Sequence, residues 1–117
     1  MATQQECEEA LTRVAGKLAG ADPSARAKLD GRTLSCAVRD LDLLYVGRLA
    51  DGALSEIRGI PADQRAALPP AQLRLHVDSD DLVLLSRGEL DFAKAWLSGR
   101  VRLEASMGDL LRLRSLL

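Results

Sequence analysis

The change of hydrophobic period near Arg32 constrains the fold more than any other feature of this sequence. Before it, apolar side chains recur every three or four residues, whereas after it Leu34, Cys36 and Val38 alternate with polar or small residues. The first spacing is typical of a helix with one buried face, and the second of a strand with one buried face. The chain is therefore expected to begin with a helix and continue with a sheet.

The N-terminal helix is expected over residues 3–19. Thr3 and Glu6 have the spacing of a capping box, in which each side chain bonds the backbone N–H of the other residue. A second, short helix is expected over residues 22–30, because its Asp-Pro start is a common N-cap pair. The buried face of the first helix is expected to hold Cys7, Ala10, Leu11, Val14, Ala15 and Leu18.

Three strands are expected next, over residues 33–39, 43–50 and 53–58. A turn at 40–42 separates the first two, and the Asp-Gly pair at 51–52 is a strong hairpin signal between the last two. The three strands form a meander. A loop then contains three prolines and is expected to hold one helical turn.

The segment 79–88 is ambiguous, because its run LVLL could continue the fourth strand, which is expected over residues 73–78. A helix is favoured, since Ser79 is a good N-cap, two Asp residues suit the positive end of the helix dipole, and Gly88 is a good stop. The remaining elements are a short helix at 92–98, a fifth strand marked by Val101 and Leu103, and a Leu-rich helix at 107–117.

These elements predict a single α+β domain over residues 1–117. It contains a five-stranded sheet, with the N-terminal helix, two short helices and the C-terminal helix packed mainly on one face.

The single Phe and the single Trp of the chain, Phe92 and Trp96, lie one turn apart on the same short helix. A helix of two turns is not stable by itself, so its two rings are expected to dock on the rest of the protein. The rings either fix the helix to the core or form one wall of an apolar cavity. Periodicity does not choose between these alternatives.

The segment 79-SDDLVLLSRGELDFAKAWLSGRVRLEASMGDLLRLRSLL-117 resembles the C-terminal half of the sterol carrier protein type 2 family. The whole chain agrees with that family in the order of its elements, while the match of residues is confined to 73–113. The chain departs from the family at Ala105, where a glycine is usual, and at Ser106, where Asp or Asn is usual. The matching residues are Gly88, Phe92, Ala95, Trp96, Leu97, Gly99, Arg100, Val101, Leu103, Met107 and Leu110.

The resemblance implies a hydrophobic tunnel between the sheet and the helices that holds a sterol, fatty acid or acyl-CoA. The short aromatic helix would form one wall, and the C-terminal helix would close the other side. The residues expected to line the tunnel are Leu85, Phe92, Trp96, Leu110 and Leu113.

A catalytic or metal site is not expected. His76 shares an outward strand face with Arg74 and Asp78, whereas Cys36 faces the core and Cys7 lies beneath the first helix. One His and two dispersed Cys have no metal-ligand spacing, and no phosphate-binding or nucleophile motif is present. The chain is therefore expected to be no enzyme and to need no cofactor.

Charge and hydropathy restrict the partners. The formal net charge of −1 argues against nucleic-acid binding, and the weak positive excess of residues 87–117 allows at most a transient membrane contact. No signal peptide or membrane span is visible, so the cytoplasm is expected. The 13 Arg against 3 Lys are typical of a GC-rich bacterial genome.

Three functions stay open at this point. The first is a carrier or binding module for an apolar ligand. The second is an interaction protein or homodimer with a vestigial cavity, suggested by the wide leucine stripe of the C-terminal helix. The third is a small enzyme that acts through Cys36 or His76.

Overall fold

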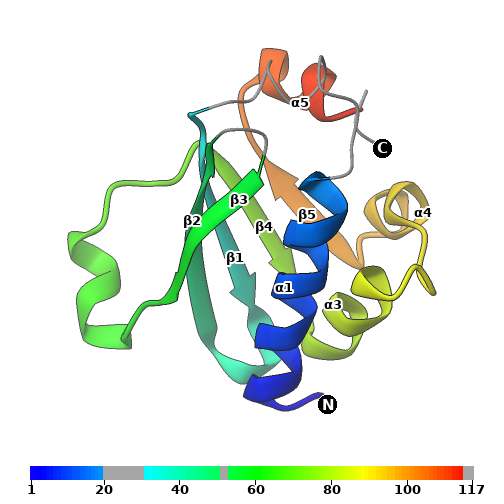
Figure 1. The fold of residues 1–117 in the computed structure, drawn as a ribbon, viewed down its shortest axis with the longest axis horizontal. Coiled ribbons are helices and arrows are strands. Elements are labelled where there is room, and N and C mark those ends of the chain that lie inside the picture. Colours follow the sequence, from blue (N-terminus) through cyan, green and yellow to red (C-terminus); the bar gives the residue numbers. More distant parts are fainter. Residues whose placement is uncertain (20–30, 51–52, 115–117) are drawn as a thin grey trace.

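Five strands form one mixed sheet in the order β3-β2-β1-β4-β5 (Figure 1). This computed structural model describes residues 1–19, 31–50 and 53–114. The pair β1–β4 is parallel, while β1–β2, β2–β3 and β4–β5 are antiparallel. The strands are β1 (Thr33–Val38), β2 (Leu43–Ala50), β3 (Ala53–Gly59), β4 (Leu73–Val77) and β5 (Val101–Glu104).

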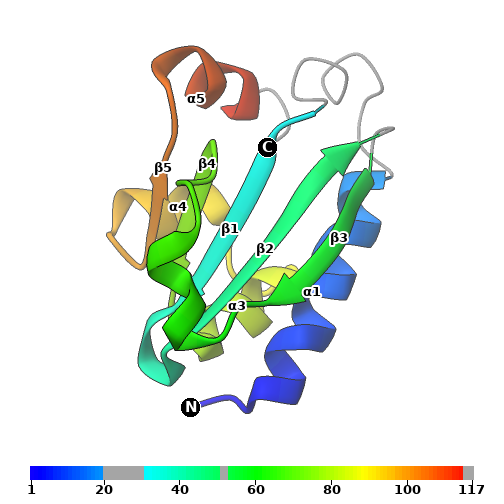
Figure 2. The ribbon, with the colours of Figure 1, turned by 90° about the vertical axis from the view of Figure 1, so that its left-hand side faces the viewer.

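The helices lie mainly on one face of this sheet, as the sequence predicts. Helices α1, α3 and α4 lie on that face, and α5 lies beyond the end of β5 in both views (Figures 1 and 2). The 3-10 turn η2 lies on the opposite face, and η1 follows β1 directly. The second helix, expected over 22–30, lies outside the described residues. The bounds are α1 (Gln4–Ala19), η1 (Arg39–Leu41), η2 (Ala62–Ala67), α3 (Ser79–Ser86), α4 (Phe92–Leu97) and α5 (Met107–Arg114).

The core lies between the sheet and α1, on the face that the alternation of β1 predicts. Cys36 and Val38 are buried there, with exposed fractions of 3% and 0%. Cys7 and Ala10 of α1 pack into the same cluster and are both fully buried. The capping box at the start of α1 is confirmed by reciprocal bonds of 3.1 Å between Thr3 and Glu6.

A β-bulge in β3 sets which of its side chains face the helices. Between Ser55 and Arg58, β3 places Glu56 and Ile57 opposite the single residue Gly47 of β2. Glu56 has a φ of 56°, in the left-handed region. The extra residue lets Ile57 pack against the core, while Glu56 and Arg58 are exposed.

The start of α3 is capped from another part of the chain, which corrects the sequence-based assignment of Ser79 as the N-cap. The N-cap residue is Asp78, whose side chain makes no capping bond, and Ser79 is the first helical residue. Asp40 of η1 accepts a 2.8 Å bond from the Ser79 backbone N–H and a 2.6 Å bond from its hydroxyl. The Ala2 N–H donates to Ser79 Oγ at 2.9 Å, so Ser79 joins the N-terminus, η1 and α3.

Replacing Asp40 with Ala should lower the free energy of unfolding by about 1 kcal/mol at neutral pH, the usual cost of a lost helix cap. Desolvation opposes ionisation of Asp40, but the hydrogen bonds from Ser79 outweigh it and hold the pKa of that carboxyl below its ordinary value. Its stabilisation is therefore present above the unfolded-state pKa and is lost as the pH falls through the folded-state pKa. Urea unfolding at pH 7 and near pH 3 measures both effects.

The matched control is Asp63→Ala. Asp63 is an exposed carboxylate in η2 with no ion pair or hydrogen bond to the described residues. Its loss should change stability by less than about 0.5 kcal/mol. The capping role of Asp40 would be contradicted if both variants lost the same free energy of unfolding. It would also be contradicted if the loss for Asp40→Ala were as large near pH 3 as at pH 7.

The register of β1 predicts that the thiol of Cys36 is unreactive in the native protein. Burial, and secondarily the neighbouring Cys7, raise the pKa of the Cys36 thiol to about 12. Little thiolate is therefore present at pH 8, and the native protein should react with a thiol reagent only after unfolding. Labelling of the native protein at the rate of the urea-unfolded protein would mean that the strand register is wrong by one residue.

Candidate functional site

Helix α4 places the two predicted wall rings side by side. It follows Asp91, its N-cap residue, and ends before Gly99, whose φ of 82° suits a glycine. The ring centroids of Phe92 and Trp96 are 6.2 Å apart with planes tilted by 58°, and both side chains are half-buried. Ala95, between them in sequence, is buried at 1% exposure. Both rings thus keep accessible surface while α4 docks through Ala95.

The other predicted lining residues are distributed over two helices. Leu85 of α3 and Phe92 pack against the same buried core. Leu110 is half-buried on α5, and the side chain of Leu113 lies outside the described residues. The structure therefore brings Phe92 together with Trp96 and with the core that Leu85 contacts. That all five residues line one tunnel stays a prediction.

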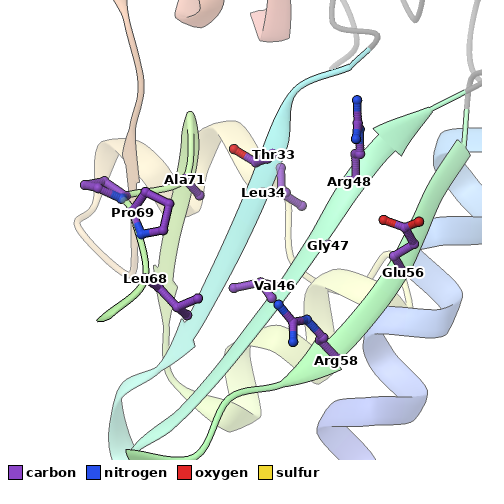
Figure 3. A pocket seen from close by; sticks show the side chains of 11 residues that line it. Thr33, Leu34, Val46, Gly47, Arg48, Glu56, Arg58, Leu68, Pro69 and Ala71 are labelled. Atoms are coloured by element: carbon purple, nitrogen blue, oxygen red, sulfur yellow. The ribbon is translucent and has the colours of Figure 1, made fainter. Parts of the chain in front are cut away.

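A cavity of about 270 Å³ lies on the opposite face of the sheet (Figure 3). The sheet forms its floor, and the segment 68–71 forms one wall. Most of the floor and wall is apolar, and charged side chains reach its rim. The lining residues are Thr33, Leu34, Val46, Gly47, Arg48, Glu56, Arg58, Leu68, Pro69, Pro70 and Ala71.

The topology explains why this cavity exists. Strand β3 is at one edge of the sheet, while β4 lies on the far side of β1, so the connection between them must cross the sheet. Because the helices occupy the other face, η2 and the segment 68–72 cross over this one (Figure 2). The cavity lies between that crossing segment and the strands beneath it.

Both ends of the crossing segment are fixed by hydrogen bonds. Near η2, Arg65 donates at 2.8 Å both to Asp42 Oδ1 and to the Asp42 carbonyl. Before β4, the Gln72 N–H donates to Thr33 Oγ1 at 3.0 Å, and the Thr33 N–H donates to Gln72 Oε1 at 3.2 Å. The cavity wall is therefore held at a defined height above the sheet.

A second hollow, of about 240 Å³, lies between α1 and β3 and is more polar. Tyr45 lines it and donates a 3.3 Å hydrogen bond to Glu8 Oε2. Burial, together with the negative charge of Glu8, raises the pKa of Tyr45 to about 12. The phenol therefore stays protonated and serves as a donor that joins α1 to β2.

The residues considered for catalysis are not brought together. His76 lies on the face away from the helices, half-buried, with Nε2 3.6 Å from Glu104 Oε1. Arg74 and Arg102 form ion pairs with Glu104, at 3.2 and 3.0 Å, whereas His76 Nε2 has no hydrogen-bond partner among the described residues. Cys36 is buried in the core on the other face. Within the described ranges, no group of three or more His, Cys, Asp or Glu side chains could hold a metal ion.

No helix in the described part of the chain is long and apolar enough to cross a membrane.

No family model matches the sequence, and no curated protein matches it. Solved structures do match. Sterol carrier protein 2-like 2 from Aedes aegypti superposes with a TM-score of 0.67 at 14% identity, over 97% of this chain and 98% of that one. A sterol carrier protein 2 crystal structure gives 0.63 at 16% identity, over 97% and 88%.

An enzyme also contains this fold. The inverting sec-alkylsulfatase Pisa1 from Pseudomonas sp. matches with a TM-score of 0.58 at 23% identity, over 83% of this chain. The chain spans only 14% of the length of that enzyme. The comparisons thus agree in architecture at low sequence identity, and the chain has the sterol carrier protein 2 fold, as its C-terminal residues predict.

Proposed function

We propose that this chain is a carrier or binding domain for an apolar ligand of the sterol, fatty acid or acyl-CoA type. The observation that carries the proposal is the likeness to sterol carrier protein structures along 97% of the chain. One such neighbour, SCP2L2 from Aedes aegypti, is described as palmitated. A fatty acid is therefore a reasonable first ligand to test.

Binding of this kind needs no catalyst. An apolar ligand gains about 25 cal/mol for each Å² of surface removed from water, and a few polar groups at the mouth set its orientation. Both cysteine thiols are buried, which supports a role without catalysis. The domain would act alone or as a binding module for a separate enzyme.

We place this ligand on the helix-covered face, beside α4. Phe92 and Trp96 are half-buried, so each ring keeps surface that a ligand could cover. Phe92 packs against the same core cluster as Leu85, and α5 carries Leu110. The lining set proposed from the sequence is retained: Leu85, Phe92, Trp96, Leu110 and Leu113.

The second candidate is a non-catalytic interaction protein or homodimer with a vestigial cavity. Three large apolar side chains on α4 and α5 are exposed, namely Leu97 at 90%, Met107 at 73% and Leu111 at 61%. Such side chains favour a protein partner when they form a patch. Analytical ultracentrifugation distinguishes the candidates, because the dimer predicts a concentration-dependent mass.

Trp96 should report ligand binding directly. Palmitate, palmitoyl-CoA and cholesterol are titrated while the fluorescence of the single Trp is followed, and native mass spectrometry of freshly purified protein detects a retained ligand. A saturable change is expected for at least one ligand. Phe92→Ala should weaken the affinity for that ligand at least about fivefold, because truncation of the ring removes about 1 kcal/mol or more of favourable ligand contact.

Leu97→Ala is the matched control, since Leu97 is on the same helix but 90% exposed. It should leave the affinity unchanged. Circular dichroism establishes that both variants are folded. If no ligand changes the Trp96 signal and none is retained, the carrier proposal fails and the interaction protein takes its place.

A further inference from the structure

The cavity under segment 68–71 has the size and lining of a site for a small ligand. Its volume of about 270 Å³ lies just below the usual range of small-molecule sites, about 300–1,000 Å³. Since an apolar cavity of about 150 Å³ holds a benzene ring, this one has room for a short alkyl chain. Val46 on the floor and Leu68 in the wall are half-buried side chains that such a chain would cover.

The cavity wall formed by segment 68–71 is preformed in the absence of a ligand. Pro69 and Pro70 have restricted φ angles and no backbone N–H, so this part of the wall is stiff and has no donor to satisfy. The bonds of Arg65 and Thr33 hold the segment on either side. A preformed wall lowers the ordering cost of binding.

The rim carries two arginines with no carboxylate partner among the described residues. Seven of the ten arginines whose side chains are described form an ion pair. The other three, Arg48, Arg58 and Arg87, form none with the described residues, and two of these three line this cavity. Figure 3 shows Arg48 and Arg58 extending from β2 and β3 on the side of the cavity opposite Pro69.

One carboxylate, Glu56, also reaches the rim, but it is not paired with either arginine. The bulge of β3 gives it this outward position. Two cations and one anion leave a local charge of +1. A ligand with one negative charge neutralises this rim, whereas a second charge would meet the repulsion of Glu56.

We propose that this cavity binds an amphipathic monoanion, an alkyl carboxylate or a chemically similar acid. The alkyl part lies between Val46 and the 68–71 wall, and the acid group lies between Arg48 and Arg58. Exposed charge pairs contribute little by themselves, so the apolar part supplies most of the affinity. The guanidinium groups supply the preference for an acid over a neutral ligand of equal length.

This site is separate from the one proposed beside α4, because the sheet lies between them (Figures 1 and 2). It therefore holds or fails independently of the carrier proposal.

The test uses the full chain and three probes in ¹⁵N–¹H NMR titrations: octanoate, 1-octanol and acetate. Octanoate should shift the amides of residues 46–48 and 56–58 in a saturable way. Octanol should bind at least about fivefold more weakly, and acetate should not saturate, since it lacks the alkyl chain.

Variants then test the arginines. The double variant Arg48→Gln, Arg58→Gln should weaken octanoate about tenfold and leave octanol unchanged. Arg87→Gln is the matched control, because Arg87 is also exposed and without a partner in the described residues but does not line the cavity. It should leave both affinities unchanged. Glu56→Gln should improve binding of octyl phosphate, a dianion near pH 8, more than binding of octanoate.

Three results would overturn the proposal. The first is octanoate shifts confined to α4 and α5. The second is an octanol affinity equal to that of octanoate. The third is an octanoate affinity that the double variant does not reduce, or that Arg87→Gln reduces equally. Octanoate shifts on β2 and β3 without a change in Trp96 fluorescence would support this site even if the carrier proposal fails.

Discussion

The parallel pairing of β1 with β4 determines most of this structure. Parallel neighbours cannot be joined by a tight turn, so the chain must leave β3 at the sheet edge and cross to reach β4. That crossing puts η2 and segment 68–71 on one face. Helices α3 and α4, which follow β4, cover the other face together with α1. Both proposed sites are consequences of this single pairing, one on each face of the sheet.

The bulge at Glu56 connects the core to the outer cavity. Leu54 of β3 is buried in the core. Without the extra residue, strict alternation after Leu54 would turn Ile57 outward and Arg58 toward the core. A non-glycine residue with φ of 56° costs about 1–2 kcal/mol. Burial of Ile57 and exposure of the Arg58 charge offset that cost. The same local distortion therefore completes the hydrophobic core and places two charged side chains at the cavity rim.

Much of the fold could be predicted because its signals are local. The alternation of β1, the capping box of Thr3 and the stop at Gly88 each depend on a few neighbouring residues. The cap of Ser79 by Asp40 could not be predicted, since 39 residues separate the two partners. The cavity could not be predicted for the same reason. Its floor and wall are brought together by the order of the strands in the sheet, and hydrophobic periodicity does not predict that order. The one local hint was the double proline at 69–70.

The two proposed sites differ in whether they can bind a charged ligand. A charged group taken out of water is costly unless it is paired, and the buried Asp109 illustrates this, since Arg32 lies 3.2 Å from its carboxylate. A ligand on the helix-covered face must therefore be neutral or keep its charged group outside the core. At the outer cavity the charge stays at an exposed rim beside Arg48 and Arg58, and only the alkyl part is buried. A sterol is suited to the first site, and a short acid to the second.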